Sequence, residues 1–426
     1  MLWNPDLETL DRERLASVQL QRLHETLRRQ LERVPVMRDR LHAAGVHSAD
    51  DIRALDDLRR LPFTHKTDLR EHYPFGLFAV PREEVVRVHA SSGTRGKPTV
   101  VGYTRNDLAV WSEVMARTLA MAGVVPGMVL HNAYGYGLFT GGLGFHMGAE
   151  LLGCTVVPIS GGLSQRQVLV LEDLGGQVLC CTPSYALNIA QTLGEQGIGL
   201  DRLKLEVGIF GAEPWTEQMR DAVERELGLK ALNVYGLSEI VGPGVAAECL
   251  EMRSGAHVQE DHFLVEIIDP VTGDVLGPGQ EGELVFTTLT KEALPMLRYR
   301  TGDISSLDVT PCACGRTSVR MARIRGRFDD MLIIRGVNLY PSEVERVRLG
   351  IPEVAPHYQL IVDRPGTMDE LTVMCEATAI SEALEQGIHH TLREATGLSM
   401  VVRVLPPGSV PRSEGKAVRV VDNRPR

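Results

Sequence analysis

The chain of 426 residues is too long for one ordinary hydrophobic core, so we expect two or more domains. Apolar residues make up 43% and charged residues 23%, which is typical of a globular protein and argues against a disordered one. The formal net charge of −10 disfavours a general nucleic-acid binder, so a polyanionic ligand would need a local cationic patch.

The amino-terminal stretch MLWNPDLETL does not combine a cationic start with an apolar run, and no apolar stretch is long enough to cross a bilayer. We therefore expect neither a secretory signal nor a membrane span. The seven cysteines then favour reduced thiols in the cytoplasm over a disulfide framework.

The predicted elements change character along the chain. Residues 7–45 space their apolar side chains at three and four positions, which predicts helix. In the middle, short apolar runs such as GQVLCCT alternate with helical stretches such as WTEQMRDAVERELG, which predicts α/β layers with parallel strands. The runs in FLVEIIDPVTGDVLGPGQEGELVFTTL are joined by Gly, Pro and Asp turns and predict a small antiparallel β unit. We expect a large multi-subdomain N-terminal domain over 1–326 and a small α+β domain over 327–426.

The stretch HASSGTRGKPTVVGYT is a loop rich in small residues, hydroxyls and cations before a predicted strand, and such a loop suits phosphate oxygens. A Walker loop opens on glycine and follows its Gly-Lys pair with serine or threonine, but here Ser91 and Pro98 hold these places, which argues against a P-loop NTPase. The glycines of GYGLFTGGLGFHMG lack the strand, helix and acidic residue of a dinucleotide site, so close packing around a pocket is the favoured interpretation.

Further stretches follow in a fixed order: VYGLSEIVG at 234–242, RYRTGDISSL at 298–307, GRFDDMLIIRGVNLYPSEVE at 326–345 and, near the end, PRSEGKAVRVVD. Alone, each could be a core aromatic, a turn or a solvated tail. Together with GAEPW and AYGYGLFTGGLG, this set resembles the phenylacetate–CoA ligase family of the adenylate-forming superfamily. The resemblance extends from about Leu2 to the C-terminus.

This resemblance implies an acid–thiol ligase with two half-reactions. A carboxylate attacks the α-phosphate of ATP to give acyl-AMP and pyrophosphate, and the thiol of CoA then displaces AMP. The resemblance also implies that the small C-terminal domain is mobile and turns at Asp329 between the two steps, with Arg335 and Gly336 along the pantetheine channel in the second. A homodimer is implied as well.

The family's ATP and AMP residues can be carried over position by position, and their chemistry suits a step in which negative charge must be neutralised. Tyr235 would pack on the adenine, and Asp303 would accept hydrogen bonds from the ribose. Glu239 would bind Mg²⁺, and Lys416 would bridge the substrate carboxylate and the α-phosphate. The other implied nucleotide residues are Ser91, Ser92, Gly93, Thr94, Gly96, Lys97, Gly211, Ala212, Glu213, Pro214, Gly236, Ser238 and Arg327.

One position departs from the family pattern. Arg95 stands in the phosphate loop where the family usually has a second threonine. Its guanidinium could grip pyrophosphate directly or take a peripheral or solvent position, and we favour the second interpretation.

The expected acid pocket draws on AYGYGLFTGG, GIFGAEP and IVGPG, in which aromatic side chains supply walls and glycines leave room for a ring. Its implied lining is Tyr134, Tyr136, Phe139, Ala212, Ile240 and Pro243. A phenylacetate-like acid fits the resemblance. Benzoate-, hydroxyaryl- or indole-type acids remain open because one pocket substitution changes selectivity by about 1–3 kcal/mol. A second alternative also remains open, in which the enzyme loads a carrier protein instead of CoA.

Cysteines and histidines also suggest a metal site. PCACGR holds Cys312 and Cys314, and Cys249, His257 and His262 stand upstream. The C-x-C spacing is tighter than is usual for zinc, so a buried cysteine and a simple turn are the alternative interpretation. The resemblance implies a structural zinc on Cys249, His257, Cys312 and Cys314, with His262 as a substitute ligand.

Overall fold

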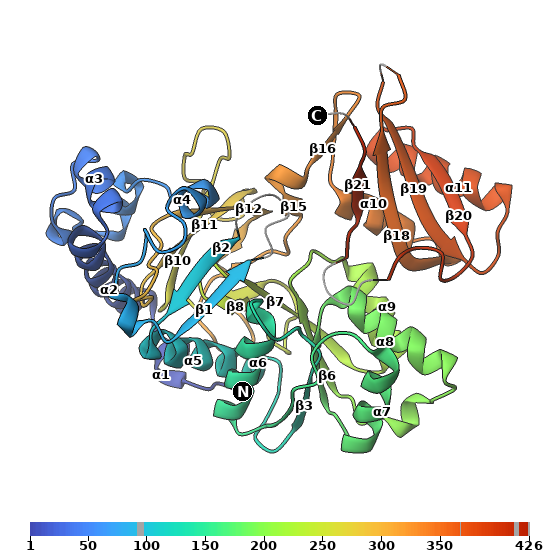
Figure 1. Ribbon diagram of the computed structural model, residues 1–426, viewed down its shortest axis with the longest axis horizontal. Helices are drawn as coiled ribbons and strands as arrows, with labels where there is room; N and C mark the ends of the chain where they lie inside the picture. Colours follow the sequence, from blue (N-terminus) through green and yellow to red (C-terminus); the bar gives the residue numbers. More distant parts are fainter. Residues whose placement is uncertain (92–97, 367, 413–416, 425–426) are drawn as a thin grey trace. The chain divides into compact units, whose positions relative to one another are not determined.

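The computed structural model describes residues 1–91, 98–366, 368–412 and 417–424. The chain packs as two compact units, whose elements are labelled in Figure 1. Unit 1 comprises Met1–Ser160, Gln177–Cys180 and Leu232–Arg323, and unit 2 comprises Gly161–Gly176, Cys181–Ala231 and Ile324–Arg426.

Unit 1 begins with helices, as predicted for residues 7–45. The helix α2 (Arg12–Arg33) begins after Asp11, whose side chain accepts a hydrogen bond from the Arg14 N–H. It ends at Arg33, before the capping residue Val34, because Pro35 opens a new helix. The other helical segments are α1 (Pro5–Glu8), α3 (Pro35–Ala43), α4 (Lys66–Glu71), α5 (Arg105–Met121), α6 (Thr140–Leu152) and the 3₁₀ turns η1 (Ala49–Asp51), η2 (Leu55–Arg60) and η3 (Arg82–Glu84).

The strands of unit 1 include a parallel group and an antiparallel group. In the first, β3 (Val129–Asn132) pairs in parallel with β4 (Thr155–Val157) and β5 (Val178–Cys181), as the alternating pattern predicts. In the second, consecutive neighbours pair antiparallel, and its strands are β7 (Lys230–Leu237), β8 (Gly242–Ala247), β9 (Ala256–Val258), β14 (Arg320–Met321) and β13 (Leu307–Asp308).

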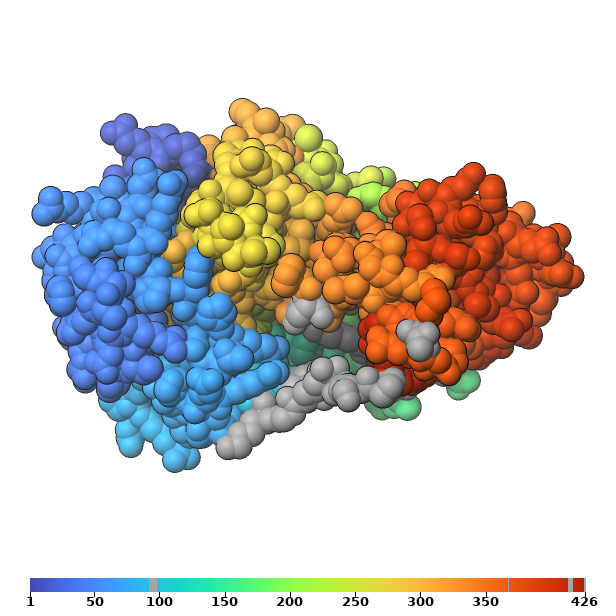
Figure 2. Space-filling view, turned by 90° about the horizontal axis from the view of Figure 1, so that it is seen from above, coloured from blue at the N-terminus to red at the C-terminus, as the bar shows by residue number. Residues whose placement is uncertain are grey.

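The predicted antiparallel β unit is also present. The strands β10 (Phe263–Ile268), β11 (Gly282–Thr288) and β12 (Tyr299–Ser305) pair antiparallel in chain order. The segment between β10 and β11, coloured yellow in Figure 2, lies at the surface, and its Val271 is 83% exposed.

The hairpin of β1 (Arg87–Ser91) and β2 (Thr99–Tyr103) flanks the predicted phosphate loop, with Ser91 opposite Thr99. Helices α5 and α6 pack on each other and on β8 (Figure 1). Their contact depends on small residues, because a Cβ added to Gly144 would lie 2.7 Å from the Trp111 ring. This packing brings the glycine-rich start of α6 close to β8.

Unit 2 contains a helical part in which α7 packs on α8 and α8 packs on α9. Every residue of its strand β6 (Val207–Gly211) is buried. The helical segments here are α7 (Ser164–Leu174), α8 (Pro183–Glu195), α9 (Glu217–Leu227) and the 3₁₀ turn η4 (Leu200–Arg202).

The C-terminal part of unit 2 is α+β, as predicted. Its sheet has the order β20 (Val401–Leu405), β19 (Glu370–Ala377), β18 (Val354–Asp363), β21 (Val420–Asp422), with β18 and β19 antiparallel and the outer pairs parallel. Helices α10 (Pro341–Leu349) and α11 (Glu382–Thr396) pack on each other and on this sheet (Figure 1). Shorter segments are β15 (Gly326–Arg327), η5 (Phe328–Asp330), β16 (Leu332–Ile334) and β17 (Val337–Leu339).

Among the helices that the structure describes, none has the length and apolar character needed to span a membrane.

Candidate active site

Two residues expected to bind nucleotide meet in unit 1. Tyr235 lies on β7 and Asp303 on β12, and the Tyr235 hydroxyl donates a hydrogen bond of 2.6 Å to Asp303 Oδ2. The Tyr235 ring is stacked on Phe286, with ring centroids 6.0 Å apart. The contact therefore joins an aromatic face and a carboxylate from two strands that are far apart in the sequence.

The carboxylate of Glu239 is almost fully buried after the end of β7, and Lys66 Nζ lies 3.7 Å from its Oε1. The Lys66 side chain is 40% exposed, so solvent weakens this ion pair. Sequence reasoning did not find Lys66, because a single lysine at the start of α4 carries no pattern that points to Glu239. Next to Glu239, the Ser238 hydroxyl lies 3.2 Å from that of Thr140.

Gly236 has a packing role as well as its implied nucleotide role. A Cβ at this position would lie 2.0 Å from the carbonyl oxygen of Gly242, on the neighbouring strand β8. Only glycine therefore fits where the two strands approach.

The aromatic residues expected to form the acid pocket cluster around the start of α6. Tyr134 is buried and stacks on Phe145 with centroids 5.0 Å apart. A Cβ added to Gly141 would lie 2.4 Å from the ring of Phe139 and 3.2 Å from that of Tyr134. The glycine thus allows both rings to approach the helix start.

The hydroxyl of Tyr136 accepts a hydrogen bond of 2.8 Å from Asn132 Nδ2 and lies 3.1 Å from His146 Nδ1. Burial raises the pKa of Tyr136 to about 12, so its hydroxyl stays protonated at neutral pH. Ile240 is fully buried, and the Pro243 carbonyl accepts a hydrogen bond from the indole of Trp111. The hydrogen bond from Trp111 holds the start of β8 against α5.

The GAEP segment of unit 2 follows β6, and Ala212 has a φ of 70°, which is uncommon for a residue with a Cβ. Glu213 accepts hydrogen bonds from two backbone N–H groups, 2.7 Å from Ser184 and 2.9 Å from Ala417. Gly211 ends β6, and Pro214 follows Glu213.

The residues implied in the hinge and the CoA channel lie in unit 2. Arg327 ends β15 with its Nε 3.7 Å from Asp330 Oδ2, and the backbone of Asp329 lies in η5. Arg335 and Gly336 both have positive φ at the turn between β16 and β17. Arg335 donates a hydrogen bond to the Ser399 carbonyl and lines a hollow of about 720 Å³ beside α11 and β20.

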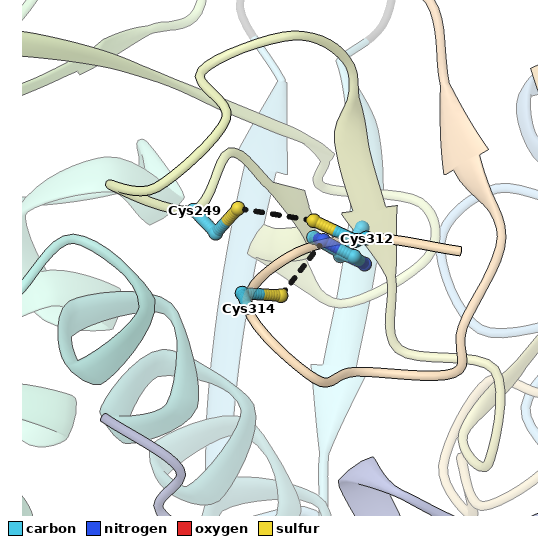
Figure 3. Close-up of side chains that lie close together, drawn as sticks. Cys249, Cys312 and Cys314 are labelled. Atoms are coloured by element: carbon cyan, nitrogen blue, oxygen red, sulfur yellow. Dashed lines mark hydrogen bonds between the residues drawn. The ribbon is translucent and has the colours of Figure 1, made fainter. Parts of the chain in front are cut away.

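Three cysteines and a histidine converge between the loop after β8 and the loop before β14. The ligand atoms of Cys249, His257, Cys312 and Cys314 all lie within 4.8 Å of one another. Cys249 Sγ lies 3.6 Å from Cys312 Sγ, and Cys314 Sγ lies 3.4 Å from His257 Nε2, as Figure 3 shows for the three labelled cysteines. The other ring nitrogen of His257 lies 3.1 Å from the Ser318 hydroxyl, which orients the ring.

The electrostatics of this cluster suit a metal ligand set. A hydrogen bond from Cys249, with further help from His257, lowers the pKa of Cys314, so a thiolate forms there readily. His262, the substitute ligand considered from the sequence, lies in a different cluster. Its ring nitrogens are 3.2 Å from Asp261 and 2.9 Å from Thr290.

Several predicted site residues belong to parts of the chain that the structure does not describe. Ser92, Gly93, Thr94, Arg95, Gly96 and Lys97 of the phosphate loop lie outside the described residues, as does Lys416. Their roles stay predictions.

Comparison with known proteins gives a consistent result. The family model described as AMP-binding enzyme matches residues 31–289, and that of the AMP-binding enzyme C-terminal domain matches residues 336–424. Similar proteins include a phenylacetate-coenzyme A ligase of Thermus thermophilus, 56% identical over 100% of both chains. One of Escherichia coli is 51% identical over 98% of this chain and 97% of its own.

A crystal structure of 2-hydroxyisobutyryl-CoA ligase in the postadenylation state is also similar, with a TM-score of 0.93 and 29% sequence identity, over 99% of this chain and 92% of that one. The fold and the matches over nearly the whole chain define an adenylate-forming enzyme of the AMP-forming acid–CoA ligase class. Within this class, the chain belongs to the phenylacetate–coenzyme A ligase family. The family predicted from the sequence motifs is thus confirmed, as is the α/β fold with a large N-terminal and a small C-terminal domain.

Proposed function

We propose that the protein joins an aryl acid of the phenylacetate type to CoA through an acyl-AMP intermediate, releasing AMP and pyrophosphate. The observation that carries this proposal is the hydrogen bond between Tyr235 and Asp303, two motif residues 68 positions apart. It places an aromatic face beside a carboxylate, as recognition of an adenine and its ribose requires. The relatives of Thermus thermophilus and Escherichia coli, which are named for this reaction, support the proposal.

In the first half-reaction, Tyr235 would pack on the adenine and Asp303 would accept hydrogen bonds from the ribose hydroxyls. Glu239 would hold Mg²⁺, whose charge would neutralise phosphate oxygens, and its carboxylate oxygens fit this hard cation. Lys66, beside Glu239, adds a second positive charge on the same side. Ser91, residues 92–97 and Arg327 would bind phosphate or ribose oxygens, and Lys416 would bring the acid to the α-phosphate.

In the second half-reaction, the small domain would turn at Asp329 and bring Arg335 and Gly336 to the pantetheine channel. Gly336 would allow the thiol arm to approach the backbone closely, since it carries no Cβ. We place the boundary of the moving part between residues 326 and 327. Proteolysis at this point that leaves a folded fragment of residues 1–326 would support the boundary, and cleavage elsewhere would move it.

The acid would lie among Tyr134, Tyr136 and Phe139, whose rings meet around Gly141 and Gly142. The family resemblance implies that Ile240, Pro243 and Ala212 would complete this lining. Because the Tyr136 hydroxyl is engaged by Asn132, the wall offers mainly apolar ring faces to a substrate. A phenyl ring suits such a wall better than a charged or highly hydroxylated side chain.

The proposal is tested with a panel of aryl acids in the presence of ATP, Mg²⁺ and CoA, following AMP release. We expect phenylacetate to give the highest kcat/KM, with benzoate-, hydroxyaryl- and indole-type acids lower. An enzyme that exchanges pyrophosphate into ATP but releases no AMP on addition of CoA would instead load a carrier protein.

The role of Lys416 has a sharper test. Lys416→Ala should abolish acyl-AMP formation and leave thiolysis of supplied acyl-AMP intact, because the lysine charge acts only on the first step. Loss of both half-reactions to the same extent would contradict this role.

We also propose a structural zinc ion on Cys249, His257, Cys312 and Cys314. The donor set matches a tetrahedral Cys₃His site, and four protein ligands leave no open position for a substrate. The metal would fasten the loop after β8 to the loop before β14, and so support the region that carries Glu239 and Asp303.

Thiol ligands require reduced cysteines, so we place the enzyme in the cytoplasm, where ATP and CoA are also available. A homodimer remains a prediction of the family resemblance. Light scattering coupled to size-exclusion chromatography tests it, and a mass of one chain would contradict it.

A further inference from the structure

A half-buried carboxylate links two distant segments next to the proposed catalytic lysine. Glu213 follows β6, and its two oxygens accept separate backbone hydrogen bonds, Oε1 from Ser184 at 2.7 Å and Oε2 from Ala417 at 2.9 Å. Ala417 is 204 residues away in sequence and directly follows Lys416. The carboxylate therefore restrains the chain one residue from the lysine.

The Glu213 carboxylate is itself well fixed. Ser184 lies in the first turn of α8, which begins at Pro183 after the capping residue Thr182. Exposed N–H groups and the helix dipole favour a negative charge at such a helix start. Because one oxygen is held by α8, the other is directed to Ala417 with little freedom to move.

The other flank of the same segment is held by a second set of contacts. Arg412 forms a two-pronged ion pair with Glu376, with both N–O distances at 2.8 Å, and its Nε donates to Gln191 Oε1 at 3.1 Å. Gln191 lies on α8, the helix that also holds Glu213. Residues 412 and 417 are thus both joined to α8, directly or through Glu213.

We propose that Glu213 is a positioning residue that docks the segment bearing Lys416 for acyl-AMP formation and is released for thiolysis. This inference rests on the proposed function, in which the small domain turns between the two half-reactions. Glu213 precedes the proposed boundary and Ala417 follows it, so a turn of the small domain breaks the hydrogen bond between them. In this proposal, the bond belongs to the arrangement in which Lys416 serves the first step.

The experiment compares the two half-reactions in the full-length enzyme. Pyrophosphate release without CoA follows acyl-AMP formation, and CoA thioester formation from supplied acyl-AMP follows thiolysis, each with the acid that the wild type uses best. Glu213→Ala should slow acyl-AMP formation about 10- to 100-fold, the equivalent of one hydrogen bond to a charged group. Thiolysis should stay within about twofold of the wild type.

Further variants separate positioning from folding. Glu213→Gln keeps the size of the side chain but has one acceptor oxygen for two N–H donors. It should therefore also slow acyl-AMP formation and leave thiolysis unchanged. Gln191→Ala should show a smaller loss in the same step, because Arg412 keeps its ion pair with Glu376. As a matched control, Glu224 accepts a 2.8 Å hydrogen bond from the Ala231 N–H, and Glu224→Ala should change neither half-reaction.

Equal losses in both half-reactions, or unchanged acyl-AMP formation in Glu213→Ala and Glu213→Gln, would overturn the inference while leaving the proposed function in place. A wild type that forms no acyl-AMP from any acid would remove the proposed function, and the inference with it.

Discussion

A single hydroxyl group connects two of the proposed nucleotide residues, and it can be removed without losing the aromatic ring. Tyr235→Phe keeps the stacking on Phe286 but leaves Asp303 without its 2.6 Å hydrogen bond. A carboxylate that has lost this hydrogen bond is less well oriented for the ribose, so we expect kcat/KM for ATP to fall about 10-fold, the equivalent of roughly 1.4 kcal/mol. Steady-state kinetics with varied ATP provides the measurement.

The control for this variant is Tyr358→Phe, which removes another buried hydroxyl, 3.3 Å from the Pro341 carbonyl. It should lower stability slightly and leave the KM for ATP unchanged. An unaltered kcat/KM in Tyr235→Phe would contradict a nucleotide role for this pair.

Gly142 shows how one missing methyl group shapes the proposed acid pocket. A Cβ at this position would lie 2.6 Å from the Gly135 carbonyl oxygen and 3.0 Å from the Tyr136 ring. Gly142→Ala must therefore shift backbone or ring, and we expect a loss of about 1–3 kcal/mol in the free energy of unfolding. The KM for the acid should rise because Tyr136 is displaced, and urea unfolding with acid-dependent kinetics measures both.

Gly194 is an exposed helical glycine where, unlike at Gly142, an added methyl group meets no close neighbour. No heavy atom lies within 4 Å of its added Cβ, and it sits in α8. Gly194→Ala should therefore stabilise the protein by about 0.5–1 kcal/mol and leave the acid KM unaltered. If both substitutions had the same effect, the close contacts around Gly142 would not be the cause.

The cysteine cluster brings two loops together, with Cys249 Sγ 3.6 Å from Cys312 Sγ. If the cluster binds zinc, protein prepared without chelator should contain about one zinc per chain. Cys312→Ser should lower the zinc content and the melting temperature together, because a ligand that joins the two loops is lost. Metal analysis and thermal unfolding check this, with Cys154→Ser, outside the cluster, as the control.

The loop before β14, which carries Cys312 and Cys314, is held to the N-terminal helix α1 by an ion pair. Arg316, two residues after Cys314, forms a fully buried ion pair of 2.6 Å with Glu8. Glu8→Ala would leave the guanidinium without its buried carboxylate, so we expect a loss of about 3–5 kcal/mol in the free energy of unfolding. Urea unfolding measures it, and an effect below about 1 kcal/mol, as for a surface ion pair, would show that the anchor is not formed.

Stability of the whole molecule should depend on pH through His262. Burial lowers the pKa of His262 to about 4, despite the opposing effect of the neighbouring Asp261 carboxylate. The unfolded chain protonates this ring near pH 6.5, so the stabilisation is complete above about pH 6.5 and is lost as the pH falls towards 4. We expect a slope of about 1.4 kcal/mol per pH unit in that range from this ring alone.

Urea unfolding at several pH values measures this slope, and His262→Gln should reduce it because no ring is left to titrate. The exposed ring of His390, 72% accessible, provides the control, and His390→Gln should leave the slope unchanged. A wild type whose stability is constant between pH 4 and about 6.5 would contradict a neutral buried His262.

Much of the fold followed from local patterns. An apolar run predicted β2 after the phosphate loop, and turn residues predicted the antiparallel pairing of β10 and β11. The strand β8 was not predicted, because its sequence GPGVAA contains glycine and proline rather than strand-forming residues. Its pairing with β7 depends on Gly236 and Gly242, which let the two backbones approach.

The candidate site, like the fold, has features that local sequence patterns predict and features that they do not. Motifs of neighbouring residues were enough to indicate the family, the nucleotide residues and the candidate zinc ligands. The residue types that such binding needs occur together in short stretches of the sequence. The contacts that these residues make could not be predicted in this way, because they join residues far apart in the chain. Only the tertiary structure pairs Lys66 with Glu239, brings Cys249 to Cys312, and holds Ala417 on Glu213, since strand pairing and helix packing decide which distant side chains come within hydrogen-bonding distance.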